Sequence, residues 1–124
     1  MALYRKLNRE TRIRRSILSG LTKDCILHEK VETTEERAKE VRKFVDKMIT
    51  YAKKGDLMSR RKALAFLEND KEVVKKLFDE LSIRYKDRNG GYTRIIKLKE
   101  RRGDDALIVS LELVQDTICV FSFK

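Results

Sequence analysis

A long amphipathic segment, residues 31–55, constrains the fold of this chain more than any other stretch. Thr33 and Glu36 have the spacing of a capping box at its start, and Gly55 follows two lysines as a left-handed stop. About 20 helical residues span roughly 30 Å, the width of a small domain. We therefore expect the rest of the chain to pack along one apolar stripe of this helix, made by Ala38, Val41, Phe44, Val45, Met48, Ile49 and Ala52.

The flanking segments predict an α+β fold in which helices pack on a small antiparallel sheet. Apolar residues keep helical spacing over three further stretches, which are residues 11–27, 56–67 and 71–83. The period then changes to two over residues 92–99 and 106–114, which predicts a C-terminal hairpin with one apolar face. The helices would cover that face, because a sheet must bury its apolar side against another layer.

Three parts of the chain are expected from these patterns. Residues 1–10 form a basic arm with too little apolar content to fold alone, so we expect a partner to order it. Residues 11–114 form a single α+β domain, with a third strand near residues 27–32 as one option for that short stretch. Residues 115–124 form a C-terminal tail that could add an edge strand or dock on the core.

Positive charge is concentrated in three short segments. The formal net charge is +10, from 30 Lys and Arg against 20 Asp and Glu. Basic residues outnumber acidic ones by six to one in residues 1–15, by five to one in residues 53–62 and by eight to two in residues 83–102. One such run could simply be a solubilising surface, but three runs at loops or ends favour a polyanionic partner.

These segments supply candidate anion-binding residues, because arginine binds phosphate in two-point geometry. Tyr85 and Tyr92 could stack on an unpaired base, although packing within the fold is the more common role for such tyrosines. The candidates drawn from the basic segments include Arg12, Arg14, Arg15, Lys53, Lys54, Arg88 and Tyr92.

Catalytic and cofactor sites are not predicted. Cys25 and His28 share a helix face, but two ligands do not make a zinc site. Asp104 and Asp105 fit a hairpin loop, and residues 89–91 lack the phosphate-loop pattern. We expect no enzyme activity, metal, cofactor or small-molecule substrate. There is also no membrane span, secretory signal or disulfide framework, so a reducing intracellular compartment is expected.

Four sequence blocks resemble the bacterial-type family of large-subunit ribosomal protein L17. They are Y-R-K-L-N-R near the start, V-E-T-T-E-E-R-A-K-E-V-R, M-I-T-Y-A-K-K-G-D-L with two arginines after it, and G-G-Y-T-R-I-I-K-L followed by R-R-G-D. The resemblance covers about residues 4–113. It differs at Asn8, where the family usually has glycine, and at Lys99-Glu100, which replaces a link containing glycine or proline.

The resemblance implies an α+β ribosomal protein that binds 23S ribosomal RNA and meets neighbouring large-subunit proteins in the cytoplasm. The residues it would place against RNA are Arg5, Lys6, Arg9, Arg60, Arg61, Arg94, Arg101 and Arg102. The alternative hypothesis is a DNA-binding regulator that uses residues 56–67 and 71–83 as a helix-turn-helix. It is weaker because residues 63–82, which contain most of the second helix, hold five acidic residues against three basic ones, which does not suit a recognition helix.

Overall fold

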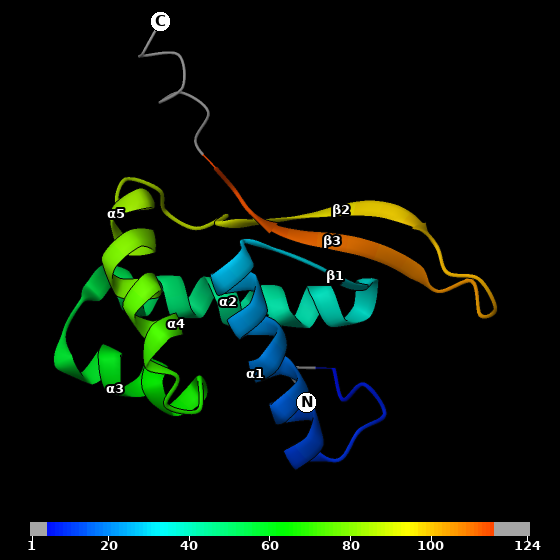
Figure 1. The fold of residues 1–124 in the computed structure, drawn as a ribbon, viewed down its shortest axis with the longest axis horizontal. Coiled ribbons are helices and arrows are strands. Elements are labelled where there is room, and N and C mark those ends of the chain that lie inside the picture. The colour runs from blue at the N-terminus through cyan, green and yellow to red at the C-terminus, as the bar shows by residue number, and fades with distance from the viewer. Residues whose placement is uncertain (1–4, 116–124) are drawn as a thin grey trace, which may run out of the picture.

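The long helix and the sheet form two layers. The structure is a computed structural model, and it describes residues 5–115. Helix α2, Glu35–Lys54, lies along one face of the sheet. Helix α1, Thr11–His28, lies on the same side of the sheet and crosses α2 (Figure 1). The α+β architecture predicted from the sequence is confirmed.

The sheet pairs strands that are far apart in the sequence. Its described strands are β1, Lys30–Thr34, β2, Thr93–Glu100, and β3, Leu107–Leu113, in the antiparallel order β1-β3-β2. The predicted hairpin is therefore confirmed, and the short stretch before α2 is a strand. A bulge between Lys97 and Lys99 shifts the register of β2 against β3. The tip of the hairpin extends past the helices (Figure 1).

The predicted start of the long helix is wrong. Thr33 pairs with Val109 in β1, and α2 begins at Glu35 after Thr34, which makes no side-chain capping bond. The capping-box spacing was therefore misleading, because pairing with β3 uses the residues that would have formed the first turn. The predicted stop is correct, since Gly55 has a φ of 68° and its N–H bonds the carbonyl of Tyr51 at 3.2 Å.

The remaining helices form a second group at one end of α2. Helix α3, Leu57–Phe66, is capped by Asp56, whose carboxylate accepts a bond from the Ser59 N–H at 2.8 Å. After a turn, α4, Lys71–Lys76, continues through the π-helical turn η1, Leu77–Leu81, into α5, Ser82–Arg84. The predicted helix over residues 71–83 is therefore present, with one widened turn.

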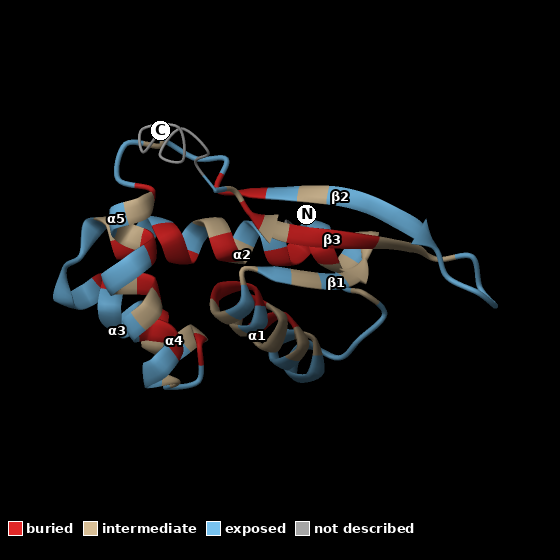
Figure 2. Ribbon diagram, turned by 45° about the horizontal axis from the view of Figure 1, so that its top comes forward, coloured by how far each residue is buried: buried red, intermediate tan, exposed pale blue. Residues whose placement is uncertain are grey.

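The core lies between α2 and the sheet and between α2 and the other helices. Figure 2 shows buried residues along α2 and β3, whereas the hairpin tip is exposed. Six of the seven residues predicted for the α2 stripe are buried, and Phe44 is partly exposed. Leu57, in the first turn of α3, is 62% exposed. Residues 116–124, and the options considered for them, lie outside the described part of the chain.

Candidate nucleic-acid interface

The N-terminal segment is folded against the body. Arg5 forms an ion pair with Glu36 at 3.0 Å, and Leu7 packs on the hydrophobic core. Leu7 and Asn8 have φ values of 55° and 53°, so the backbone turns through the left-handed region here. Asparagine tolerates that region better than most residues, so Asn8 suits this turn. The turn leaves Lys6 and Arg9 exposed.

The first turns of α1 present three arginines. Arg12 and Arg15 are exposed and Arg14 is partly exposed, while the buried residues of this helix begin at Leu18. Within residues 5–115, no carboxylate lies within 4.0 Å of any of these guanidinium groups. Their charge is therefore available to an external anion.

The basic side chains around Gly55 are of two kinds: one is hydrogen-bonded within the fold, and the others are exposed. The Lys53 ammonium donates to the Arg88 carbonyl at 2.6 Å and to the Tyr92 hydroxyl at 3.0 Å, so it joins α2 to the loop before β2. Lys54 and Arg61 are exposed and have no carboxylate partner in the described structure. Arg60 is also exposed, and the central carbon of its guanidinium group lies 4.9 Å from the centre of the Phe78 ring.

Tyr92 packs inside the fold. It is only 3% exposed, its ring centre lies 5.2 Å from that of Tyr85, and its hydroxyl donates to the Arg88 carbonyl at 3.1 Å. A base could stack on Tyr92 only if this ring left its packed position, so the predicted contact between Tyr92 and RNA stays a prediction. Arg88 is partly exposed and donates to the Gly91 carbonyl at 3.3 Å.

The hairpin arginines differ in how far they are already paired. Arg94 binds Glu112 through two nitrogens at 3.3 and 3.2 Å. Arg101 binds Asp104 in a two-point pair, which lowers the pKa of that carboxyl to about 2. Arg102 is exposed and has no such partner among residues 5–115. An anion that approaches Arg94 or Arg101 has to compete with a carboxylate.

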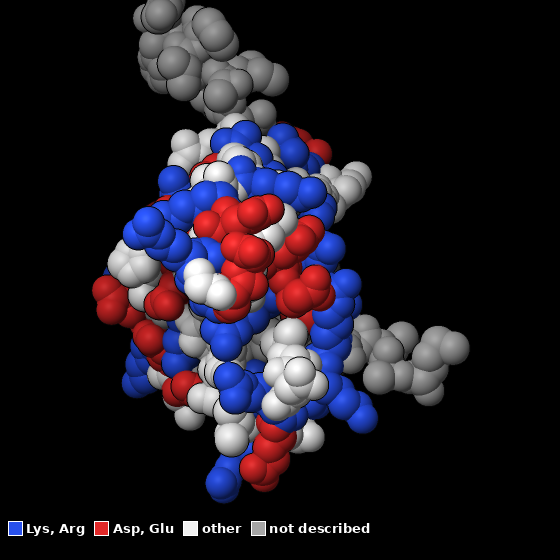
Figure 3. Space-filling view, turned by 90° about the vertical axis from the view of Figure 1, so that its right-hand side faces the viewer, with Lys and Arg blue, Asp and Glu red and all other residues white. Residues whose placement is uncertain are grey.

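The predicted residues do not form one continuous patch. The N-terminal segment and the hairpin tip lie toward one end of the long axis, and α3 lies toward the other (Figure 1). In the end-on view of the hairpin side, Lys and Arg surround a central group of Asp and Glu (Figure 3). The cations are therefore spread over a length suited to an extended partner rather than to a single small anion.

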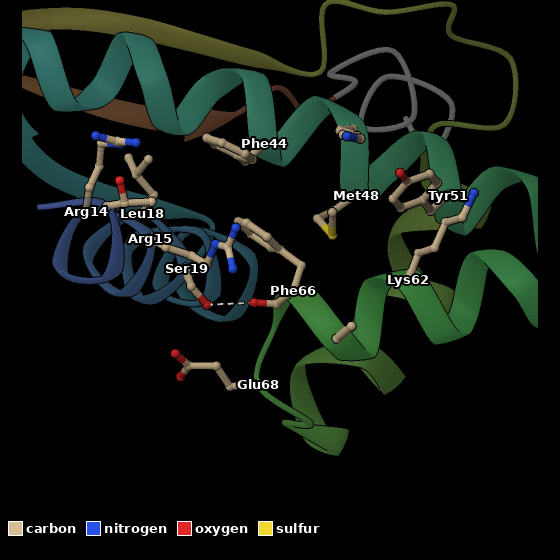
Figure 4. A pocket seen from close by; sticks show the side chains of 13 residues that line it. Arg14, Arg15, Leu18, Ser19, Phe44, Met48, Tyr51, Lys62, Phe66 and Glu68 are labelled. Atoms are coloured by element: carbon tan, nitrogen blue, oxygen red, sulfur yellow. Dashed lines mark hydrogen bonds between the residues drawn. The ribbon is translucent and has the colours of Figure 1, made fainter. Parts of the chain in front are cut away.

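A groove between α1, α2 and α3 brings together cations that were not predicted as a site. Its volume is about 610 Å³. Besides Arg14 and Arg15, it contains Lys47, Lys62 and the rings of Phe44, Tyr51 and Phe66 (Figure 4). Lys62 belongs to a basic run in the sequence, but the groove that it shares with residues of α1 depends on packing that the sequence does not display.

The described residues offer no built metal or nucleophilic centre. No group of three or more His, Cys, Asp or Glu among residues 5–115 could hold a metal ion. Cys25 is fully buried, and burial raises the pKa of its thiol to about 12, so it stays protonated. None of the described helices is both long and apolar enough to cross a membrane.

The helix-turn-helix alternative gains no support from the geometry. The second of its two helices is interrupted by the π-helical turn and exposes Glu72, Asp79 and Glu80. These carboxylates would face a phosphate backbone of like charge.

Within residues 5–115, the structure defines the class of protein as a basic α+β body that exposes arginines without carboxylate partners over its length. Comparison with known proteins gives the family. The family described as Ribosomal protein L17 matches residues 17–114, and the chain belongs to it. The chain is 57% identical to the large ribosomal subunit protein bL17 of Ligilactobacillus salivarius, covering 90% of this chain and 98% of that protein. It is also 57% identical to the bL17 of Caldanaerobacter subterraneus, with the same coverage, and 54% identical to that of Clostridium perfringens, covering 92% of this chain and all of that protein.

Proposed function

We propose that this protein binds 23S ribosomal RNA through cations at both ends of its long axis and so stabilises the packing of RNA segments. The ribosomal role itself follows from the family. The protein is a structural constituent of the large ribosomal subunit, is associated with ribosomes in the bacterial cytoplasm, and is not an enzyme.

The observation that carries the RNA proposal is a set of cations without an intramolecular carboxylate. Each lies on the surface or at its edge, and none has an acidic partner within 4.0 Å in residues 5–115. They are Lys6, Arg9, Arg12, Arg14, Arg15, Lys54, Arg60, Arg61 and Arg102. Binding to phosphates would release counterions and neutralise this surplus charge. We assign smaller contributions to Arg5, Arg88, Arg94 and Arg101, which already make internal contacts.

We also propose that neighbouring ribosomal proteins cover part of the exposed apolar surface. Leu57 and Met58 begin α3, and Ile96 and Leu98 lie on β2, an edge strand of the sheet. Large apolar side chains that stay exposed together are typical of contact surfaces.

The salt dependence of binding to 23S ribosomal RNA tests the proposal. One variant replaces Arg9, Arg12, Arg60, Arg61 and Arg102 with glutamine. A control variant makes the same change of net charge at Lys30, Lys39, Lys71, Lys75 and Lys86. Each lost phosphate contact lowers the slope of log affinity against log salt by about 0.7–0.9. For five lost contacts, we expect the slope of the arginine variant to decrease in magnitude by about 3.5–4.5, and that of the control by about one or less.

Equal losses in the two variants would overturn the assignment of these residues. Sedimentation of the tagged protein in a sucrose gradient provides an independent check. The wild-type protein should travel with 50S particles, and the arginine variant should appear increasingly in the free fraction as salt is raised.

A further inference from the structure

The groove between α1, α2 and α3 combines an apolar floor with a cationic rim. Figure 4 shows Arg14 and Arg15 on α1, Phe44 and Tyr51 on α2, and Lys62 on α3 around one space. Its volume of about 610 Å³ lies within the range of about 300–1,000 Å³ that is typical of small-ligand sites. The groove is therefore large enough for one organic group of moderate size.

The charge of the rim is not balanced by carboxylates among residues 5–115. Arg14, Arg15, Lys47 and Lys62 all line the groove, and none has a carboxylate within 4.0 Å among the described residues. Glu68 is the acidic residue of the lining, and it is already bound to Lys23 at 2.8 Å. An occupant of this groove should therefore carry negative charge.

The floor of the groove is aromatic. The rings of Phe44 and Phe66 stack with centres 5.0 Å apart and planes inclined by 12°, and both rings are partly exposed. The ammonium groups of Lys47 and Lys62 lie 6.0 and 5.9 Å from the centre of the Tyr51 ring. Planar apolar surfaces beside cations suit a group that has a flat ring at one end and an anion at the other.

We propose that the groove holds one unstacked nucleotide of ribosomal RNA. Its base lies against Tyr51 and Phe66, and its flanking phosphates meet Arg14, Arg15, Lys47 and Lys62. This inference rests on the proposed function and adds a site of a particular kind to it. Proteins recognise single-stranded RNA by stacking bases on aromatic rings beside a cationic path for the backbone.

A side chain from a neighbouring protein is the competing occupant. The four cations, which have no carboxylate partner in the described part of the chain, favour RNA, because an apolar side chain would leave their charge unmatched in a partly enclosed space.

Two pairs of variants test the site in the full-length protein. Tyr51→Leu removes a ring and keeps an apolar side chain, whereas Tyr51→Phe keeps the ring. The double variant Lys47→Gln/Lys62→Gln removes two rim charges, and Lys71→Gln/Lys75→Gln on exposed α4 is its control for net charge. Thermal melting by circular dichroism establishes that each variant is folded. The probe is 23S ribosomal RNA transcribed from the genome that encodes this protein.

We expect Tyr51→Leu to bind about tenfold more weakly than wild type, and Tyr51→Phe, which keeps the ring, to bind more tightly than Tyr51→Leu. For the Lys47→Gln/Lys62→Gln variant, the slope of log affinity against log salt should decrease in magnitude by about one to two. The decrease should be less than one for its control. Ultraviolet crosslinking of the wild-type complex, followed by mass spectrometry, should place a nucleotide on a peptide that contains Phe44, Tyr51 or Phe66.

Three results separate the two proposals. If wild type binds the RNA, crosslinks appear only outside the groove, and both test variants match their controls, the nucleotide site is overturned and the proposed function stands. If assembled 50S particles crosslink these residues to a protein, the nucleotide site is likewise overturned. If the wild-type protein does not bind 23S ribosomal RNA better than an unrelated RNA, the proposed RNA-binding function fails.

Discussion

Two glycines of this chain have opposite conformational roles. Gly55 ends α2 with a φ of 68°, a backbone conformation that costs a residue with a Cβ roughly 1–2 kcal/mol. Gly20 lies inside α1, where no such conformation is required and a Cβ would meet nothing within 4 Å. The first glycine is needed for its backbone, and the second only weakens a helix.

Alanine substitutions at these two positions should therefore change stability in opposite directions. We expect Gly55→Ala to lower the free energy of unfolding by about 1 kcal/mol, and Gly20→Ala to raise it by about 0.5–1 kcal/mol. At Gly55 the nearest atom to a new Cβ is the Ala52 carbonyl oxygen at 3.9 Å, so the cost is conformational and not a clash. Urea unfolding of the two variants measures both effects, and changes of the same sign would contradict this reading.

At the level of elements, Glu29 joins three parts of the fold. It follows α1 with a φ of 62°, and its carboxylate accepts bonds from Arg84 on α5 and from Gln115 after β3, both at 2.9 Å. The Lys76 ammonium on α4 lies 3.5 Å from the Glu29 carboxylate, and the Glu29 backbone carbonyl accepts a hydrogen bond from the N–H of Leu113 at 3.0 Å. The hydrogen bond from Arg84 is the main cause of a lowered pKa for this carboxyl.

The Glu29→Gln variant should be less stable by about 1–2 kcal/mol at neutral pH, because a charged acceptor shared by several donors is lost. A carboxyl with a lowered pKa contributes stability above its unfolded value near 4.5, and this contribution disappears as pH falls through the lower folded value. The difference between variant and wild type should therefore shrink below pH 4.5. Glu32→Gln, at an exposed residue of β1, is the control and should change little.

Urea unfolding at a series of pH values provides the measurement. A Glu29→Gln deficit that stays constant down to acid pH would show that the side chain acts through its shape and not through its charge.

Elements with a local sequence pattern could be predicted from the sequence. Features that depend on contacts between distant segments could not. The stripe on α2 and the alternation in β2 and β3 repeat along continuous segments, so they could be recognised without the fold. The start of α2 could not, because Thr33 and Thr34 suit either a helix cap or a strand, and pairing with β3 some 75 residues later decides between them. The widened turn at Leu77–Leu81 was also hidden, since its apolar spacing fits an ordinary helix.

The same distinction applies to the candidate site, where some features show in the sequence and others depend on packing. Runs of basic residues located the exposed cations, but burial of Tyr92 and the internal bonds of Lys53 depend on how the loop before β2 packs on α2. The groove depends on three helices at once. Lys47 and Lys62 are separated in sequence, and each is an ordinary solvent-facing lysine until α1 and α3 pack against α2.

For the whole molecule, the charge that we propose to bind RNA destabilises the free protein. The chain carries a formal net charge of +10, and many of its exposed cations have no carboxylate partner within the described residues. Such surplus charge destabilises a compact state by self-repulsion. Exposed ion pairs, which salt also weakens, contribute only about 0–1 kcal/mol each and offset this effect in part.

Salt should therefore stabilise the free protein. Raising sodium chloride shortens the distance over which charges interact, from roughly 30 Å at 0.01 M to about 8 Å at 0.15 M. We expect the melting temperature without RNA to rise over this range by about 4 °C, which corresponds to about 1 kcal/mol for a domain of this size. The variant with glutamine at Arg9, Arg12, Arg60, Arg61 and Arg102 should melt higher at low salt and respond less to added salt, because the repelling charges have been removed. Differential scanning calorimetry measures both quantities. A melting temperature that falls with salt would mean that the internal ion pairs outweigh the repulsion, and that these arginines impose no cost that ribosomal RNA has to relieve.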